Sequence, residues 1–270
     1  MLLALDVGNS NLVLGLYRGA QLEASWRLTT NRNQTVDEFN LLLGGLLATR
    51  GIAPAEAPRE VTAAIVASVV PPLDAMLREA LRRLFQVEAL FVGPGLKTGM
   101  PIHYDSPADV GADRIVNAVA GFAAHGGPLI IVDFGTATTF DVVSAAGEYR
   151  GGIICPGIAI SAEALFSRTA RLQRVEIRPP DKLIGTTTVG SIQSGLFYGY
   201  LSLVDGLIER LRAELGAESK VIATGGLAPL LARQSRFISE CDELLTLRGL
   251  RLLWERNREQ GTGDREQGRA

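Results

Sequence analysis

The chain has 270 residues, 47% of them hydrophobic, which is enough to bury one large core or two of ordinary size. Its 27 lysines and arginines nearly balance its 29 acidic residues, and the net charge of -2 offers no basic excess for nucleic acid or an anionic membrane. Small solutes are therefore the expected partners. The two cysteines, Cys155 and Cys241, have no Cys-x-x-Cys spacing, which argues against a disulfide framework and a thiolate metal site.

No stretch of the sequence has the features of a membrane or export segment. No apolar run reaches the ~18 residues that a membrane span needs. The amino terminus also lacks the basic region that precedes the apolar part of a signal peptide. We therefore expect a cytoplasmic protein that does not contact a membrane.

The first half of the chain predicts a βββαβαβ order. Apolar, β-branched segments bounded by turn residues indicate strands, and apolar residues at helical intervals indicate helices. Thr35 with Glu38 has the spacing of a capping box at the start of the first helix. The expected elements are strands at 2–7, 11–17 and 21–29, a helix at 35–50, a strand at 61–70, a helix at 71–85 and a strand at 88–93.

The second half begins with a sequence similar to the start of the first half. The sequence Asp-Val-Gly-Asn-Ser at Asp6 aligns with Asp-Phe-Gly-Thr-Ala at Asp133, 127 residues later (133 minus 6), and each follows an apolar strand. A tandem duplication is the simplest explanation. We expect domains at 1–126 and 127–256, followed by a disordered tail at 257–270. The expected elements of the second domain are strands within 128–143, at 148–155 and at 220–224, and helices near 158–169, at 188–215 and after Gly226.

Both copies of the repeated turn combine an aspartate with glycine and small polar residues. Such a turn exposes backbone N–H groups toward one point, which suits a phosphate oxygen. A carboxylate repels phosphate unless a cation lies between them, so Asp6 is expected to hold a cation or its waters while residues 8–11 contact the phosphates. A lone Asp-x-Gly more often caps its own turn. The repetition in matched contexts favours the phosphate site here.

A second glycine signal follows the last expected strand. Gly225 and Gly226 stand between the strand at 220–224 and a helix. Paired glycines let a flat ring such as adenine lie close to the backbone. The same pattern is also an ordinary connection between a strand and a helix, so both interpretations stay open at this point.

These features resemble the actin-like ATPase superfamily, and five motifs narrow the resemblance to type III pantothenate kinase. The similarity runs from residue 1 to about 256. Small departures are Ser10, where threonine is commoner, and Thr186-Thr187 in place of Lys-Asn. The motifs are YDSPADVGADRIVNAVAG at 104–121, VDFGTATTFD at 132–141, GGIICPGI at 151–158, TTTVGSIQSG at 186–195 and ATGGLA at 223–228.

The resemblance implies an α/β fold and an activity. The fold would be two duplicated actin-like, ribonuclease H-like βββαβαβα domains with a nucleotide cleft between them. The activity would be transfer of the ATP γ-phosphate to the 4′-hydroxyl of pantothenate, the first step of coenzyme A biosynthesis. It also implies Mg²⁺, a monovalent cation (K⁺ or NH₄⁺) and a homodimer.

The resemblance further assigns roles to individual residues. Asp113 takes the role of catalytic base and Asp133 that of monovalent-cation ligand, and Arg114 is expected to pair with the substrate carboxylate. The implied pantothenate contacts are Tyr104, Gly111, Ala112, Asp113, Arg114 and Thr188, the last from the neighbouring subunit. The implied nucleotide contacts are Asp6, Val7, Gly8, Asn9, Ser10, Asn11, Leu12, Val13 and Thr136.

Taken without the resemblance, three of these residues have simpler interpretations. Asp113 in a first helical turn would serve the helix dipole, Tyr104 would be an ordinary loop aromatic, and Thr188 would be the N-cap of the helix at 188–215. Two rival functions also remain: a non-catalytic regulatory relative, and an actin-like enzyme acting on a sugar or polyphosphate. The presence of Asp6 and Asp113 argues against the first, and the stretch at 111–114 argues against the second.

Overall fold

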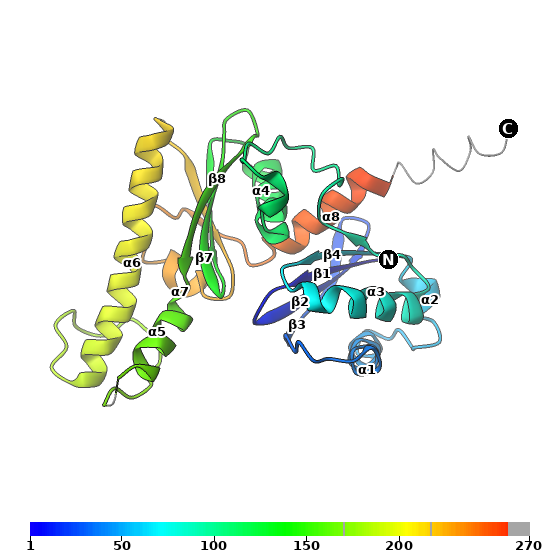
Figure 1. Ribbon diagram of the computed structural model, residues 1–270, viewed down its shortest axis with the longest axis horizontal. Helices are drawn as coiled ribbons and strands as arrows, with labels where there is room; N and C mark the ends of the chain where they lie inside the picture. Colours follow the sequence, from blue (N-terminus) through cyan, green and yellow to red (C-terminus); the bar gives the residue numbers. More distant parts are fainter. Residues whose placement is uncertain (170, 217, 259–270) are drawn as a thin grey trace. The chain divides into compact units, whose positions relative to one another are not determined.

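The computed structural model describes residues 1–169, 171–216 and 218–258 (Figure 1). The chain divides into two compact units. One comprises Met1–Ala120 together with the C-terminal helix α8 (Leu245–Arg258), and the other comprises Gly121–Leu244. Within the described ranges each unit contains one five-stranded sheet.

The sheet of the first unit has the order β3-β2-β1-β4-β5. The central strand β1 pairs antiparallel with β2 and parallel with β4. Its sequence LLALDV is buried at five of six positions because other strands flank it on both sides and helices cover its faces. Asp6 is the partly buried exception. The strands are β1 (Leu2–Val7), β2 (Asn11–Arg18), β3 (Gln21–Thr29), β4 (Ala63–Ser68) and β5 (Leu90–Phe91).

Helices cover both faces of this sheet. α1 (Val36–Ala48) and α3 (Pro71–Phe85) join the apolar cluster that contains Leu14 of β2. Side chains alternate between faces along a strand, so Gly15 belongs to the other face, where a Cβ would lie 3.0 Å from Leu247 of α8. α8 therefore packs opposite α1 and α3 (Figure 1). The capping box of Thr35 and Glu38 begins α1 as expected.

Three further short or bridging helices occur before the second sheet. α2 (Ala57–Glu60) and the 3₁₀ turn η1 (Pro107–Asp109) lie in connections. α4 (Ala112–His125) begins immediately after Gly111 and carries residues of both units.

The sheet of the second unit repeats the topology of the first. Read from one edge, its order is β8-β7-β6-β9-β10, which matches β3-β2-β1-β4-β5 strand for strand. β6, like β1, pairs antiparallel with the following strand and parallel with the strand after the helices. The predicted duplication is thus confirmed. The strands are β6 (Leu129–Phe134), β7 (Ala137–Val143), β8 (Tyr149–Pro156), β9 (Lys220–Thr224) and β10 (Glu240–Cys241).

In the described part of the second unit, three helices belong wholly to it: α5 (Ile158–Ser167), α6 (Thr188–Leu215) and α7 (Ala228–Ala232). Phe197 and Val204 of α6 pack with Phe134 of β6 and Phe140 of β7 in its core. α6 has 28 residues and ends where Gly216 takes a left-handed conformation (φ 63°), which glycine adopts without strain. Among the described residues no helix is both long and apolar enough to cross a bilayer.

The units differ from the expected domain ranges, 1–126 and 127–256, chiefly at the C-terminus. α8 was not assigned from the sequence, and it belongs with the first unit because its buried leucines pack on β1, β2 and β4. Two residues of the expected disordered tail at 257–270, Asn257 and Arg258, complete α8. Residues 259–270 lie outside the described residues.

Candidate active site

The first repeated turn joins β1 to β2 at the end of the sheet where β1 and β4 finish together. Asp6 is aligned with Val13 of β2 and Ala67 of β4. The Gly8 N–H donates to the Asn11 carbonyl at 2.9 Å, which closes the turn. In α/β sheets, ligands bind outside the carboxyl ends of the parallel strands. The phosphate turn predicted at residues 6–13 therefore lies at the edge where a ligand is expected.

Two residues that sequence reasoning missed bind this turn from the end of β3. The Thr30 hydroxyl donates to the Gly8 carbonyl at 2.6 Å, and the Arg32 guanidinium donates to Oδ1 of Asn9 at 2.8 Å. The Thr30 N–H also donates to the Ser10 carbonyl at 3.0 Å. No motif marks Thr30 or Arg32. The sequence feature that could have indicated these contacts is the predicted meander, because it places the end of the third strand beside the start of the second.

The predicted acceptor stretch at 111–114 forms the first turn of α4. Oδ1 of Asp113 accepts the N–H of Arg114 at 2.8 Å. A Cβ on residue 111 would lie 2.6 Å from that same Oδ1, so Gly111 leaves the room that the carboxylate occupies. Arg114 is buried, with 6% of its surface exposed. These contacts hold the Asp113 carboxylate in one place.

Burial changes the acid strength of Asp113. Loss of solvent raises the pKa of the Asp113 carboxyl above its usual range, and the N–H and charge of Arg114 oppose this only in part. A carboxylate with a raised pKa accepts a proton more readily at neutral pH. Such groups are frequent among catalytic residues, although structural networks also produce them.

Tyr104 lies in the loop between β5 and η1, with 40% of its surface exposed. The earlier part of this loop is attached to α8. Asn257 receives the Lys97 N–H at 3.1 Å and donates to the Lys97 carbonyl at 3.0 Å, in the manner of a paired strand. The C-terminal helix therefore anchors the loop that carries Tyr104.

The second repeated turn joins β6 to β7 and is packed closely by two glycines. Asp133 is aligned with Thr224, the last residue of β9. Gly225 has φ +92°, and a Cβ there would lie 2.5 Å from Oδ1 of Asp133. A Cβ on Gly157 would collide with the carbonyl oxygen of Thr136. The structure thus brings the turn that carries Asp133 and Thr136 against Gly225, which the sequence indicated through a second motif.

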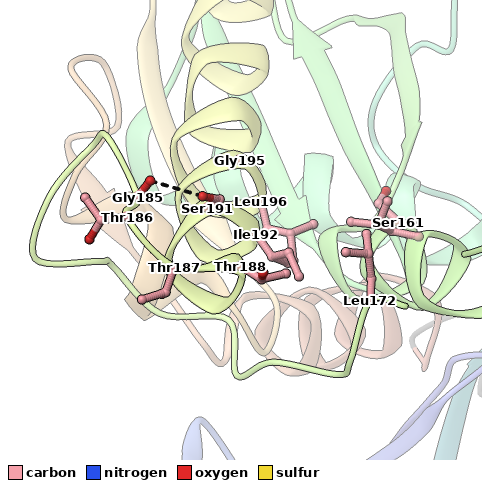
Figure 2. A pocket seen from close by; sticks show the side chains of 11 residues that line it. Ser161, Leu172, Gly185, Thr186, Thr187, Thr188, Ser191, Ile192, Gly195 and Leu196 are labelled. Carbon is pink, nitrogen blue, oxygen red and sulfur yellow. Dashed lines mark hydrogen bonds between the residues drawn. The ribbon is translucent and has the colours of Figure 1, made fainter. Parts of the chain in front are cut away.

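Thr188 lines a pocket of the second unit, between α5, α6 and the segment that joins them (Figure 2). The N-cap interpretation of Thr188 is wrong, because Thr187 is the N-cap and accepts the Gly190 N–H at 3.1 Å. Thr188 is the first residue of the helix instead. The pocket is open and has a volume of about 840 Å³. Its lining residues are Ser161, Leu165, Leu172, Gly185, Thr186, Thr187, Thr188, Ser191, Ile192, Gly195 and Leu196.

Comparison with known proteins identifies the family. A family model described as type III pantothenate kinase matches residues 2–210. The type III pantothenate kinase of Koribacter versatilis is 54% identical over 279 residues, covering 100% of this chain and 100% of that protein. A Campylobacter jejuni structure, assigned to the Baf family of transcriptional activators, has a TM-score of 0.61 at 22% identity and covers 95% of this chain and 99% of its own. The Clostridium difficile activator of 2-hydroxyisocaproyl-CoA dehydratase has a TM-score of 0.56 at 11% identity and covers 97% of both chains.

The two kinds of likeness support different conclusions. Because their sequence identities are low, the solved structures are evidence for the fold alone. They agree with the actin-like architecture of the two repeated sheets. The family match covers most of the chain, and the relative is more than half identical along its whole length. The chain therefore belongs to the type III pantothenate kinase family, whose enzymes use ATP to phosphorylate pantothenate in the first step of coenzyme A biosynthesis.

Proposed function

We propose that Asp113 is the base that takes the proton from the 4′-hydroxyl of pantothenate as that oxygen attacks the γ-phosphate. The assignment is supported by the position of the carboxylate in the first turn of α4, where Gly111 leaves room for it, and by the burial that raises its pKa. A positioned base with a pKa closer to neutral contributes typically 10²–10⁴-fold to the rate. Holding the hydroxyl against the phosphate contributes more, since phosphoryl transfer depends mainly on positioning and charge.

The other pantothenate contacts follow the acceptor stretch. We place the substrate against residues 111–114 and Tyr104. Arg114 presents a planar guanidinium, which matches a carboxylate through two parallel hydrogen bonds in a way that lysine does not. Its burial supports the role, because charge-assisted bonds gain strength where water is excluded.

The β1–β2 turn would bind the phosphates of ATP. Asp6 would hold Mg²⁺ or its water ligands, and residues 7–13 would contact the phosphate oxygens. Magnesium usually takes one or two carboxylates and completes its shell with phosphate oxygens and water, so the single carboxylate of Asp6 fits this ion. When bound, Mg²⁺ supplies positive charge that offsets the charge on the phosphates.

The β6–β7 turn would serve the nucleotide and the monovalent cation. Asp133 would coordinate K⁺ or NH₄⁺, and Thr136 would contact the nucleotide. The close approach of Gly225 to Asp133 supports a shared location for these groups.

A homodimer in the cytoplasm completes the proposal. Thr188 would contact pantothenate bound to the neighbouring subunit. The second unit has large apolar side chains open to solvent on β8, α5, α6 and the segment before α6, which favours an interface. They are Ile154 (63% exposed), Ile160 (44%), Leu183 (66%), Ile184 (82%) and Leu203 (38%). Both cysteines are free thiols, which agrees with a reducing compartment.

One assay tests the assignments. ADP release is measured with ATP, Mg²⁺ and K⁺, using pantothenate, glucose or polyphosphate as acceptor, for the wild type, Asp113→Asn, Asp6→Ala and the nearby control Asp109→Asn. We expect turnover with pantothenate only, kept in Asp109→Asn and lost in the other two variants. Pantothenate-dependent turnover at the wild-type rate in Asp113→Asn would remove the base assignment. The same result in Asp6→Ala would remove the phosphate assignment.

A further inference from the structure

We propose that Thr30 is a positioning residue that holds the β1–β2 turn in the conformation that binds the phosphates of ATP, with Arg32 orienting the side chain of Asn9. The inference rests on the phosphate role proposed for this turn. Neither Thr30 nor Arg32 belongs to the repeated turn sequence. Both lie in the segment that follows β3.

Thr30 binds the turn at two alternate carbonyls. Its hydroxyl donates to Gly8 at 2.6 Å and its backbone N–H donates to Ser10 at 3.0 Å. The backbone bond continues the ladder between β2 and β3, whereas the hydroxyl bond depends on the side chain of this residue. Serine keeps this donor at the position, whereas valine, which has nearly the shape of threonine, lacks it.

These two bonds fix the direction of the donors that an anion would use. A trans peptide is planar, so its C=O and the N–H of the next residue point in opposite directions. With the carbonyls of Gly8 and Ser10 directed at Thr30, the N–H groups of Asn9 and Asn11 must point away from it. Backbone N–H groups of a turn that face one side make a concave surface that can bind an anion.

Arg32 fixes the direction of the Asn9 side chain in a similar way. A guanidinium can only donate, so the atom of Asn9 that faces Arg32 at 2.8 Å must be the amide oxygen. The amide nitrogen of Asn9, a donor, is therefore directed elsewhere. Arg32 itself is exposed and places a positive charge beside the turn, which favours binding of phosphate over a neutral ligand.

The test separates phosphate binding from general damage. We would compare wild type with Thr30→Val, which removes the hydroxyl at nearly constant shape, Thr30→Ser, which retains it, and the matched control Thr29→Val on the exposed end of β3. The measurements are KM for ATP and for pantothenate, and the inhibition constants of ADP and of adenosine, which lacks phosphates.

We expect Thr30→Val to raise KM for ATP and the inhibition constant of ADP about ten-fold, the typical effect of one hydrogen bond. The adenosine constant and KM for pantothenate should change less than about two-fold, because neither ligand depends on the phosphate turn. Thr30→Ser and Thr29→Val should behave as wild type. A structural role alone would weaken adenosine as much as ADP, and that result would overturn the proposal.

The remaining outcomes distinguish the positioning role of Thr30 from the phosphate-binding role proposed for the turn. Wild-type ATP and ADP constants in Thr30→Val, with loss of ATP use in Asp6→Ala, would overturn the role of Thr30 alone. Unchanged ATP use in Asp6→Ala would overturn the phosphate assignment itself. If Thr30→Val does not fold, the exposed variant Arg32→Met, which keeps the length of the side chain without its donors, replaces it, with Arg27→Met as its control. A wild-type KM for ATP in Arg32→Met would overturn the proposal.

Discussion

At Asp113 two influences on a carboxylate oppose each other. A helix N-terminus favours the charged form of an acidic group, and the N–H and charge of Arg114 act in the same direction. Burial favours the neutral form and has the larger effect, so the pKa is raised. An aspartate kept only for the helix dipole would gain nothing from burial. Burial therefore makes the Asp113 carboxylate more basic and lowers the stability of the folded protein, a combination that is common at catalytic sites.

Asp113→Asn should abolish most turnover without harming the fold. We expect kcat to fall by about 10²–10⁴-fold, the usual contribution of a general base. The raised pKa means that the folded protein favours the protonated carboxyl, so stability from this group is present below the unfolded-state pKa and is lost as pH rises through the folded-state pKa. The amide cannot ionise and avoids that loss.

The melting temperature of Asp113→Asn should therefore match wild type near pH 4, about the unfolded pKa of aspartate, and exceed it at pH 7. Calorimetry at both pH values measures the difference, and ADP release at pH 7 measures kcat. A variant that is less stable than wild type at pH 7 and fully active would return Asp113 to the role of a helix-dipole residue.

The monovalent cation gives a second prediction for a single residue. If Asp133 coordinates K⁺ or NH₄⁺, activity should need one of these ions in addition to Mg²⁺, since a large, weakly hydrated cation sheds water readily to bridge carboxylate and phosphate oxygens. Na⁺ should serve poorly. Asp133→Ala should lose the response to K⁺, whereas Asp6→Ala should use ATP and Mg²⁺ poorly at any K⁺ concentration. Equal initial rates in Na⁺ and K⁺, with full activity of Asp133→Ala, would leave the second turn as a structural copy of the first.

At the scale of elements, a helix or turn could be predicted from the sequence where the residues that determine it lie close together in the chain. α6 begins and ends as expected because its apolar period is long and a glycine ends it. The repeated turns were found because the same Asp-x-Gly pattern follows an apolar strand in both halves of the chain. Thr30 and Arg32 could not be found this way, since their contacts join β3 to a turn about 22 residues earlier without a motif. α8 was missed for a related reason: its sequence is rich in arginine, and its burial is decided by strands more than 150 residues away.

Two helical glycines of the first unit should respond in opposite ways to alanine. Gly249 lies where α8 meets α4, and a Cβ there would collide with the backbone carbonyl oxygen of Val116 and lie 2.7 Å from its Cγ1. Gly249→Ala should destabilise by about 1–3 kcal/mol, because a packed contact must move. Gly45 is exposed on α1 with nothing within 4 Å, so Gly45→Ala should stabilise by about 0.5–1 kcal/mol. Urea denaturation gives both values, and equal effects of the two variants would contradict the close approach of α8 to α4.

At the scale of the whole molecule, the order of the chain and the order of the fold diverge. The sheets repeat each other, so duplication accounts for both units. The second unit is one continuous segment, Gly121–Leu244, with its own apolar core. The first unit is built from the two ends of the chain, because α8 covers a face of its sheet after the whole second unit has intervened.

This arrangement predicts that the two halves differ in their ability to fold alone. α8 buries Leu245, Leu247, Leu250 and Leu253, each at most 2% exposed. Burial of such side chains contributes roughly 1.5–3 kcal/mol each, or roughly 6–12 kcal/mol for the four. That range is comparable to the roughly 5–15 kcal/mol that stabilises a whole domain. A fragment of residues 1–125 should therefore fail to unfold cooperatively, whereas a fragment of residues 112–244, which keeps all of α4, should melt as a domain.

Circular dichroism during heating measures both transitions. The matched control joins residues 245–258 to the end of the 1–125 fragment through a flexible Gly/Ser linker, and this addition should restore a cooperative transition. The same linked fragment with Leu247 and Leu250 replaced by serine should not melt cooperatively, because both leucines lie on the buried face of α8. A sharp transition in residues 1–125 alone would show that α8 is an addition to a complete domain, and the four leucines would then contribute far less than their burial indicates.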